Sequence, residues 1–368
     1  MNKRHILFFM PSLSGGGAEQ VTFNLIKQMN TEKYHVTALL FRRSLEDRKE
    51  KENIQNLSNQ INIIELEGSR LRTVFFEFIF KIRKLKPDVI FSSLAYLNFT
   101  LVLLKKLKII SSLLALREAN MPERNIFQSS YPRIMKTLYK WSYPHVDLLI
   151  VSSSMMKKEF LSFCNIDKKN IKVMMNPVDS DYLRSKASEG VIFQNKGLRL
   201  VASGSLTYQK GFDRLINWFK ELDLPQASLT ILGDGPERDK LRGLIKSLEL
   251  ESKVYLLGYK KNPWKWVSGS DIFILSSRWE GMPNVALESL ALGVPVVSTS
   301  DSGGLVELLR KGYKSIYIYE NFDDLKSFFS EYMPIRTRGL KQSLLGKEFD
   351  QKEIYYFFEE NINNLLIR

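Results

Sequence analysis

Short apolar runs alternate with helix-length spacers through most of the chain, and this alternation limits the folds open to it. In the first half such runs cover residues 5–10, 36–41, 61–66, 89–91, 110–116, 148–151 and 171–174. Most spacers are long enough for a crossover helix, the pattern of an open parallel sheet with helices on both faces. The pattern restarts with runs at 198–202, 229–232, 254–257, 272–275, 296–298 and 316–318. The sequence therefore predicts an α/β protein with two Rossmann-like, doubly wound parallel sheets.

A polar stretch separates the two halves. The apolar pattern lapses after Asp179, and residues 185–195 are polar enough to form a linker. A chain of 368 residues suits two domains better than a single core. Near the end of the chain, Ile354, Phe358 and Ile362 recur with helical spacing, which predicts a terminal helix with one apolar side.

The chain carries no sign of a membrane span or of export. No segment approaches the ~20 uninterrupted apolar residues that a spanning helix needs. The apolar run after His5 stops at Pro11 and the glycines that follow, so it indicates a first strand rather than a secretion signal. The single cysteine, Cys164, excludes an internal disulfide and a cysteine metal cluster. We therefore expect a cytoplasmic protein.

The formal charge is +14, and nearly all of the excess lies in residues 1–180. This asymmetry indicates an anionic partner, such as a membrane surface, a phosphorylated substrate or nucleic acid. Residues 70–86 and 101–108 mix bulky apolar side chains with Lys and Arg, as interfacial helices do. Each segment fits an ordinary amphipathic helix on a sheet equally well. The summed charge favours an anionic membrane surface, and no aromatic-basic motif supports nucleic-acid binding.

Two carboxylates flank an expected strand-to-helix turn in E-G-M-P-N-V-A-L-E, from Glu280 to Glu288. Gly281 and Pro283 would keep the backbone between them open and stiff. The amides of residues 284–286 would form a helix N-terminus, which favours an anion such as a diphosphate. A carboxylate beside such a site needs another ligand, and sugar hydroxyls are candidates. The alternative is an acidic helix cap followed by a solvated helical glutamate.

Glycine turns follow the first strand of each half. Ser14-Gly-Gly-Gly-Ala-Glu opens an expected helix, where glycines let the backbone approach a phosphate or sugar. The pattern is not the G-x-G-x-x-G of dinucleotide-binding enzymes. In the second half, Gly204-Ser-Leu-Thr-Tyr-Gln-Lys-Gly places Lys210 at a strand end facing the Glu280 turn, where it could neutralise a leaving diphosphate. Each turn could also be purely structural.

The spacing of Glu280 and Glu288, with Gly293-Val-Pro-Val-Val downstream, resembles the E-x7-E signature of retaining family 4 glycosyltransferases of the GT-B fold. The resemblance implies two Rossmann-like domains facing a central cleft. It also implies a terminal helix that returns to the first domain. We therefore expect an acceptor-binding domain of residues 1–180 plus 345–368, and a nucleotide-sugar-binding domain of residues 181–344.

The resemblance also assigns roles to residues. Glu280 and Lys210 would be catalytic, Glu280 binding the donor sugar's hydroxyls and Lys210 the diphosphate, while Glu288 would bind the ribose. The family pattern G-R-L-x-x-x-K-G has an arginine where this chain has Ser205, so phosphate binding depends on Lys210 or recruits a cation such as Arg278. The donor-binding candidates are Gly16, Gly17, Ser205, Lys210, Gly233, Gly258, Tyr259, Glu280, Gly281, Met282, Pro283, Asn284, Val285 and Glu288.

Arg117 and Asn120, after an expected strand of the first half, are candidates for sugar or acceptor contacts. An ion pair of Arg117 with Glu118 is the alternative. The D-x-D at residues 179–181 matches a metal motif of another glycosyltransferase fold, but it lies at the domain junction. We therefore expect no essential metal, and no cofactor besides the nucleotide-sugar co-substrate.

These features predict retaining transfer of a hexose or N-acetylhexosamine from a UDP-sugar. The acceptor would be a lipid-linked or polysaccharide glycan of a bacterial surface, such as O-antigen, capsule or lipopolysaccharide. The enzyme would lie on the cytoplasmic, inner face of the cell membrane as a peripheral protein. Two alternatives stay open: a sugar-nucleotide epimerase of the same fold, which would need further acid and base groups, and a non-catalytic protein that binds anionic lipid or nucleic acid.

Overall fold

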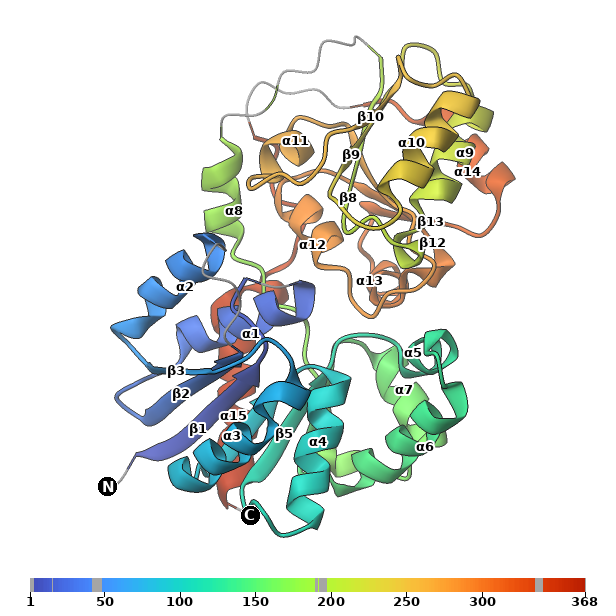
Figure 1. Ribbon diagram of the computed structural model, residues 1–368. Coiled ribbons are helices and arrows are strands. Elements are labelled where there is room, and N and C mark those ends of the chain that lie inside the picture. Colours follow the sequence, from blue (N-terminus) through green and yellow to red (C-terminus); the bar gives the residue numbers. More distant parts are fainter. Residues whose placement is uncertain are drawn as a thin grey trace. The chain divides into compact units, whose positions relative to one another are not determined.

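The computed structural model describes residues 3–14, 16–41, 48–188, 191, 197–334 and 340–367. The chain divides into two compact units (Figure 1). Unit 1 consists of Met1–Pro177 together with Glu348–Arg368, and unit 2 of Val178–Lys347. Unit 1 is therefore assembled from two separate stretches of the chain.

Seven parallel strands make up the sheet of unit 1 within the described residues, in the order β3-β2-β1-β4-β5-β6-β7. They are β1 (Arg4–Met10), β2 (Tyr34–Phe41), β3 (Asn62–Leu66), β4 (Val89–Ser92), β5 (Leu113–Glu118), β6 (Leu148–Val151) and β7 (Ile171–Val173). Each coincides with an apolar run of the first half, so the predicted doubly wound sheet is confirmed. The boundaries differ by at most two residues except in β5, where the run begins at the buried Ile110 but the strand begins at Leu113.

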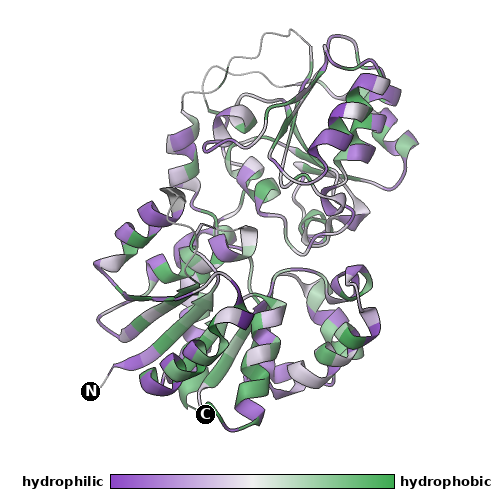
Figure 2. Cartoon of the chain, viewed as in Figure 1, coloured by the Kyte–Doolittle hydropathy of each residue, from purple (hydrophilic) through white to green (hydrophobic). Residues whose placement is uncertain are grey.

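Alternate residues of the unit 1 strands enter two different cores, as expected for a sheet covered on both faces. The helices are α1 (Gly17–Gln28), α2 (Arg48–Ser58), α3 (Leu71–Leu85), α4 (Ala95–Lys106), α5 (Pro122–Gln128), α6 (Pro132–Ser142), α7 (Ser154–Phe163) and α15 (Gln351–Ile367). In β1, Leu7 and Phe9 join the core that contains α3, where Phe9 stacks on Phe78 at 4.1 Å. Ile6 and Phe8 join the core that contains α1 and α15. The strands of this sheet are coloured largely green, for hydrophobic, in Figure 2.

Helix α15, drawn in red among the blue elements of unit 1 in Figure 1, closes the second of these cores. Ile354, Phe358 and Ile362 are buried on one side, as their spacing predicts. The Phe358 ring meets Phe91 edge-on at 5.3 Å. The Tyr355 hydroxyl accepts a hydrogen bond from the backbone amide of Asn30. The final stretch of the chain is thus an integral part of the core of unit 1.

Unit 2 has a parallel sheet of six strands among the described residues, in the order β10-β9-β8-β11-β12-β13. They are β8 (Arg199–Ser203), β9 (Ser228–Leu232), β10 (Val254–Leu256), β11 (Ile272–Leu275), β12 (Val296–Thr299) and β13 (Ile316–Tyr319). Each matches an apolar run of the second half. The order reverses between β8 and β11, and ligands of such sheets bind at the carboxyl ends of the strands near this point.

The helices of unit 2 are α8 (Ser180–Ala187), α9 (Phe212–Leu222), α10 (Arg238–Ser247), α11 (Trp264–Ser268), α12 (Asn284–Ala291), α13 (Gly304–Arg310) and α14 (Phe322–Glu331). The predicted linker at 185–195 is wrong at its start, because residues 185–187 complete α8, N-capped by the side chain of Asp179. Residues 189–190 and 192–196 of that linker lie outside the described residues. None of the helices described reaches the length and apolar character of a membrane span.

Candidate active site

A direct ion pair joins two loops at neighbouring strand ends of unit 2. Lys210 closes a short 3-10 turn after β8, and Glu280 lies in the loop after β11, the strand that pairs with β8. Lys210 Nζ lies 2.6 Å from Glu280 Oε1, and Ser277 Oγ donates to the same oxygen at 2.6 Å. The carboxylate side chain is 6% exposed and the lysine side chain 23%. The structure thus brings the two expected catalytic residues together, each compensating the charge of the other.

Arg214, in the first turn of α9, holds the backbone that carries Glu280. Its Nε donates to the Ser276 carbonyl at 2.6 Å, and its Nη2 donates to the Ser277 carbonyl. The same guanidinium contacts the Thr299 hydroxyl at 3.3 Å and the Asp301 carboxylate at 3.4 Å. One side chain therefore joins the carboxyl ends of β11 and β12 to α9. Sequence reasoning missed this residue, whose only signal is its place four residues after Lys210.

The loop after β12 supports Glu280 from another side. The backbone amide of Glu280 donates to the Asp301 carbonyl at 3.2 Å, and the Gly304 amide donates to the Gly281 carbonyl at 2.7 Å. Gly303 has φ +57°, and a Cβ there would lie 2.1 Å from the Glu280 carbonyl oxygen. Only glycine fits this close approach. Sequence reasoning missed this loop too, although the Gly303-Gly304 pair after a strand was a visible signal.

Helix α12 begins immediately beyond the Glu280 loop. Its N-cap is Pro283, which has no side chain that could cap the helix, and Asn284 and Val285 open its first turn. Met282 is buried against Gly304. The helix begins at Asn284, as the sequence predicts, so the positive end of its dipole follows Glu280 in the chain after a short loop.

Glu288 belongs to a different set of contacts. It lies one turn into α12, and its Oε2 accepts a hydrogen bond from Trp264 Nε1 on α11 at 2.8 Å. The sequence places both carboxylates around one turn, but the structure gives each of them its own partner. No motif or spacing in the sequence pointed to Trp264 as part of the site.

Arg278, the cation that phosphate binding was expected to recruit, is paired with a carboxylate of α9. Its guanidinium makes two hydrogen bonds to the Asp213 carboxylate, at 2.9 and 2.8 Å, and lies 4.0 Å from the centre of the Tyr208 ring. Burial alone would raise the pKa of Asp213, but the hydrogen bonds and charge of Arg278 bring it below its usual value. Ser205, at the position of the family arginine, is exposed in the loop after β8.

The remaining donor candidates of unit 2 lie in loops that contact one another at the carboxyl ends of β8, β9 and β10. The Gly233 amide donates to the Gly258 carbonyl at 3.0 Å. Gly233 has φ +139°, and a Cβ there would lie 1.8 Å from the Gly204 carbonyl oxygen. Tyr259 follows Gly258 and is 67% exposed. The loops after β8, β9 and β10 are therefore connected to one another by backbone contacts.

In unit 1, the glycine turn after β1 is anchored by a carboxylate of α2. Gly16 is the N-cap of α1 and makes no side-chain cap, and Gly17 is the first residue of the helix. The buried Glu50 accepts hydrogen bonds from the Leu13 amide at 2.7 Å and from the Ser14 hydroxyl at 2.6 Å. Gly15 lies outside the described residues. Glu50 was not among the sequence candidates.

Arg117 and Glu118 extend to different surroundings at the end of β5. Arg117 is 1% exposed and its Nη2 donates to Asn176 Oδ1 at 2.6 Å. Burial lowers the pKa of Arg117 to about 10. Glu118 accepts hydrogen bonds from Tyr143 and from Asn98, and burial raises its pKa to about 7. The half-buried Asn120 follows the strand.

Two family models match the chain, and together they span most of it. Residues 15–182 match glycosyltransferase family 4, and residues 185–328 match glycosyl transferases group 1. The chain is a family 4 glycosyltransferase. The family resemblance seen in the Glu280 motif is thereby confirmed.

This glycosyltransferase is similar to several curated proteins. An uncharacterized glycosyltransferase of Methanocaldococcus jannaschii is 35% identical over 62% of this chain, which spans only 59% of that relative. N-acetylgalactosamine-N,N'-diacetylbacillosaminyl-diphospho-undecaprenol 4-alpha-N-acetylgalactosaminyltransferase of Campylobacter jejuni is 28% identical over 94% of this chain and 96% of its own length. The amylovoran biosynthesis glycosyltransferase AmsD of Erwinia amylovora is 25% identical over 81% of each chain.

Solved structures of similar fold cover nearly the whole glycosyltransferase. HepE of Anabaena, solved with UDP-glucose, aligns with a TM-score of 0.76 at 18% identity, over 98% of this chain and 99% of HepE. Sucrose-phosphate synthase of Thermosynechococcus elongatus aligns with a TM-score of 0.79 at 13% identity, over 99% and 100% of the two chains. The two parallel-sheet units therefore belong to the GT-B fold.

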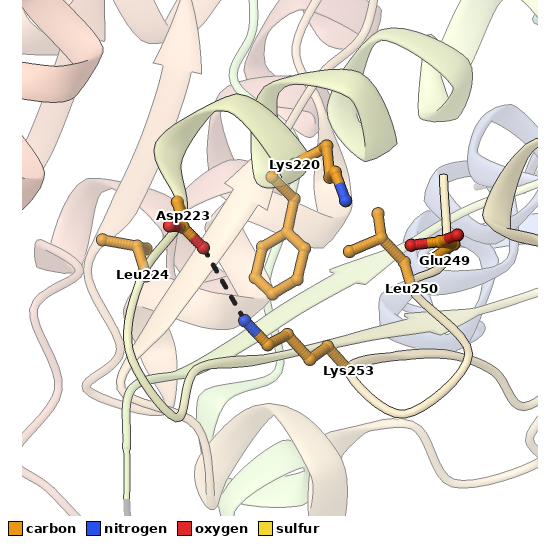
Figure 3. Close-up of a pocket in the computed structure, with 7 residues that line it drawn as sticks. Lys220, Asp223, Leu224, Glu249, Leu250 and Lys253 are labelled. Atoms are coloured by element: carbon orange, nitrogen blue, oxygen red, sulfur yellow. Dashed lines mark ion pairs between the residues drawn. The ribbon is translucent and has the colours of Figure 1, made fainter. Parts of the chain in front are cut away.

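A separate hollow of unit 2 lies away from this site (Figure 3). It is found where α9 ends and just before β10 begins, so it faces the amino ends of the strands. Its lining residues are Phe219, Lys220, Asp223, Leu224, Glu249, Leu250 and Lys253. Lys253 Nζ approaches Asp223 Oδ1 at 3.9 Å across it. Since parallel sheets bind ligands at the opposite edge, we assign the hollow no part in the reaction.

Proposed function

We propose that this glycosyltransferase transfers a hexose or N-acetylhexosamine from a UDP-sugar to a lipid-linked or polysaccharide acceptor during synthesis of a bacterial surface glycan. The Lys210–Glu280 pair beside the start of α12 carries the proposal. Relatives named for undecaprenol-linked and amylovoran glycans support the acceptor class. Similar folds solved with UDP and UDP-glucose support the donor class.

In the proposed reaction, donor binding exchanges the Lys210–Glu280 contact for two others. The ammonium of Lys210 and the first amides of α12 bind the diphosphate, while the Glu280 carboxylate accepts hydrogen bonds from sugar hydroxyls. The ammonium is then paired with the diphosphate, and the carboxylate stays hydrogen-bonded to the sugar and to Ser277, which limits the free-energy cost of the exchange. These groups stabilise the negative charge that develops on the leaving diphosphate. Glu288 binds the ribose.

The bond between the anomeric carbon and the phosphate oxygen breaks as the acceptor oxygen bonds to that carbon on the same face, so the configuration is retained. The bonding electron pair stays on the diphosphate oxygen, which takes the proton from the acceptor hydroxyl. Lys210 and the helix amides supply the charge compensation, so we propose that no metal ion is essential. The described residues contain no cluster of three or more His, Cys, Asp or Glu that could hold one.

Helix α3 supports the proposed location on the inner face of an anionic membrane. Phe76 and Phe80 are 85% and 65% exposed, one helical turn apart. Arg72 and Arg83 are exposed at the two ends of this stripe, so apolar rings and cations share one face. Such a face suits the headgroup region of an anionic bilayer.

The second basic segment supports that location less well. Lys105 at the end of α4 forms an ion pair with Asp147, and Lys106 contacts His145 and lies 5.7 Å from the centre of the Trp141 ring. These two cations have partners within unit 1, so we place the membrane contact on α3.

The direct test is mass-spectrometric screening of a nucleotide-sugar panel against lipid-linked acceptors. We expect Lys210→Ala and Glu280→Gln to lower kcat by roughly 10²- to 10³-fold. Lys240→Ala is the matched control, because Lys240 forms a surface pair with Glu237 in the same unit. Full transfer by Glu280→Gln would refute the proposed site.

Three further measurements check the remaining parts. The anomeric configuration of the product, read by NMR, tests retention, and activity in EDTA tests metal independence. Incubation with donor alone tests the epimerase alternative, since an epimerised sugar nucleotide would count against transfer. For the membrane contact, Phe76→Ser/Phe80→Ser should lose binding to phosphatidylglycerol vesicles, whereas Met333→Ser, 83% exposed in unit 2, should keep it.

A further inference from the structure

The indole of Trp264 holds the Glu288 carboxylate in a defined orientation. The Trp264 Nε1 to Glu288 Oε2 distance is 2.8 Å, within the range of a charge-assisted hydrogen bond. Trp264 is the first residue of α11, and Glu288 lies in the adjacent helix α12. An indole N–H can only donate and an ionised carboxylate can only accept, so the direction of this hydrogen bond is unambiguous.

Trp264 is itself held from two directions. Its ring meets the Tyr182 ring of α8 edge-on, with the centroids 5.7 Å apart. The preceding Asn262 donates through Nδ2 to the Lys186 carbonyl of α8 at 2.8 Å. Packing of this kind restricts the rotamers of a large aromatic side chain, so the indole N–H has little freedom to turn away from Glu288.

Helix α8 is also tied to α12 directly. Arg184 Nη1 donates to the Ala291 carbonyl at the end of α12 at 3.1 Å, and to the Lys341 carbonyl at 2.9 Å. The three helices α8, α11 and α12 are therefore connected by side chains on each pair of neighbours. The Glu288 carboxylate is thus bound to this group of helices.

We infer that Trp264 is a positioning residue that sets the Glu288 carboxylate for the ribose diol of the donor nucleotide. The inference rests on the proposed function, in which Glu288 binds the ribose. A carboxylate has about four lone-pair positions, so the indole bond does not exhaust its capacity to accept hydrogen bonds. Two hydroxyls require both carboxylate oxygens at set positions, and a freely rotating carboxylate would lose part of that binding to conformational entropy.

The test measures discrimination between ribose and deoxyribose. Calorimetry with UDP, GDP, ADP and CDP first identifies the diphosphate bound most tightly, and its 2'-deoxy counterpart is the comparison ligand. Wild type should prefer the ribonucleotide, and Glu288→Gln should lose most of the preference. Trp264→Phe keeps an aromatic six-membered ring and removes the pyrrole part with its N–H donor, so we expect roughly fivefold weaker ribonucleotide binding with nearly unchanged 2'-deoxynucleotide binding. In turnover, KM should rise while kcat changes little.

Two variants separate positioning from general damage. Trp264→His retains a ring N–H and should recover part of the discrimination, and Trp266→Phe on the same helix should match wild type. If Glu288→Gln leaves the preference intact, or if no diphosphate binds, the ribose role of Glu288 is wrong, and this inference fails with it. If Glu288→Gln removes the preference but Trp264→Phe does not, only the role of Trp264 is wrong. Tighter ribonucleotide binding by Trp264→Phe would show that the indole competes with the ribose.

Discussion

Substitution of Arg214 should destabilise unit 2 more than its place near the surface suggests. Its guanidinium is bonded to the carbonyls of Ser276 and Ser277, which are both buried, and to the Asp301 carboxylate. A hydrogen bond from a charged donor is worth roughly 1.5–3 kcal/mol, and removing the donor leaves buried acceptors unpaired. For two carbonyls we expect Arg214→Ala to lower the free energy of unfolding by roughly 3–6 kcal/mol. Arg214→Lys should lower it by roughly 1–3 kcal/mol, since one ammonium cannot reproduce the fork.

Urea unfolding followed by tryptophan fluorescence can measure this loss in unit 2 itself. The five tryptophans are Trp141 in unit 1 and Trp218, Trp264, Trp266 and Trp279 in unit 2. In a Trp141→Phe background the signal therefore comes from unit 2 alone. The matched control is Arg242→Ala, because Arg242 forms an exposed pair with Asp239 at 3.8 Å, and such pairs contribute little. Equal midpoint shifts for the Arg214 and Arg242 variants would refute the reasoning.

Three further predictions concern both units. Burial raises the pKa of Glu118 to about 7 from a usual 4.5, so the folded chain binds this proton more tightly than the unfolded chain and stability should fall as pH rises between these values. Glu118→Gln should reduce this loss of unfolding free energy between pH 5 and pH 7 by on the order of 2 kcal/mol, as measured by urea titrations. An unchanged slope of the unfolding free energy against pH would contradict the prediction. Gly233→Ala should lower the melting temperature and weaken nucleotide binding, because its Cβ would lie 1.8 Å from a carbonyl oxygen. Gly243→Ala, in α10 with open space around it, should stabilise the protein by roughly 0.5–1 kcal/mol, and similar behaviour of the two variants would count against the steric argument. Glu50→Gln should cost roughly 1–3 kcal/mol in the same titrations, since an amide cannot accept with both of its terminal atoms, and no change would show that the glycine turn does not depend on this carboxylate.

The strands were predictable because burial on both faces of a parallel sheet leaves continuous apolar runs in the sequence. The positions of Lys210 and Glu280 followed from the same pattern, since loops after neighbouring strands meet at one edge of a sheet. The pattern could not show that the two side chains pair directly, because pairing depends on rotamers and loop conformations.

Side chains that act across long separations were missed for a related reason. Arg214 contacts Thr299 across 85 positions of sequence, and no local period or motif encodes that contact. The expectation for Arg278 was likewise made without its partner Asp213, which lies 65 positions away in the sequence. Local sequence patterns place residues at an edge of the sheet, whereas specific side-chain partners depend on the packing of distant segments.

The return of α15 into unit 1 bears on how the polypeptide matures during translation. The ribosome releases residues 1–177 well before residues 348–368, so the sheet face that Ile354 and Phe358 later cover stays unprotected in the nascent chain. Residues 178–347 form one contiguous segment and can acquire their native structure in the meantime. Domains usually mature in the order of synthesis, and exposed apolar surface attracts chaperones. In this polypeptide the order is inverted, because residues 1–177 leave the ribosome before residues 178–347 but are completed after them.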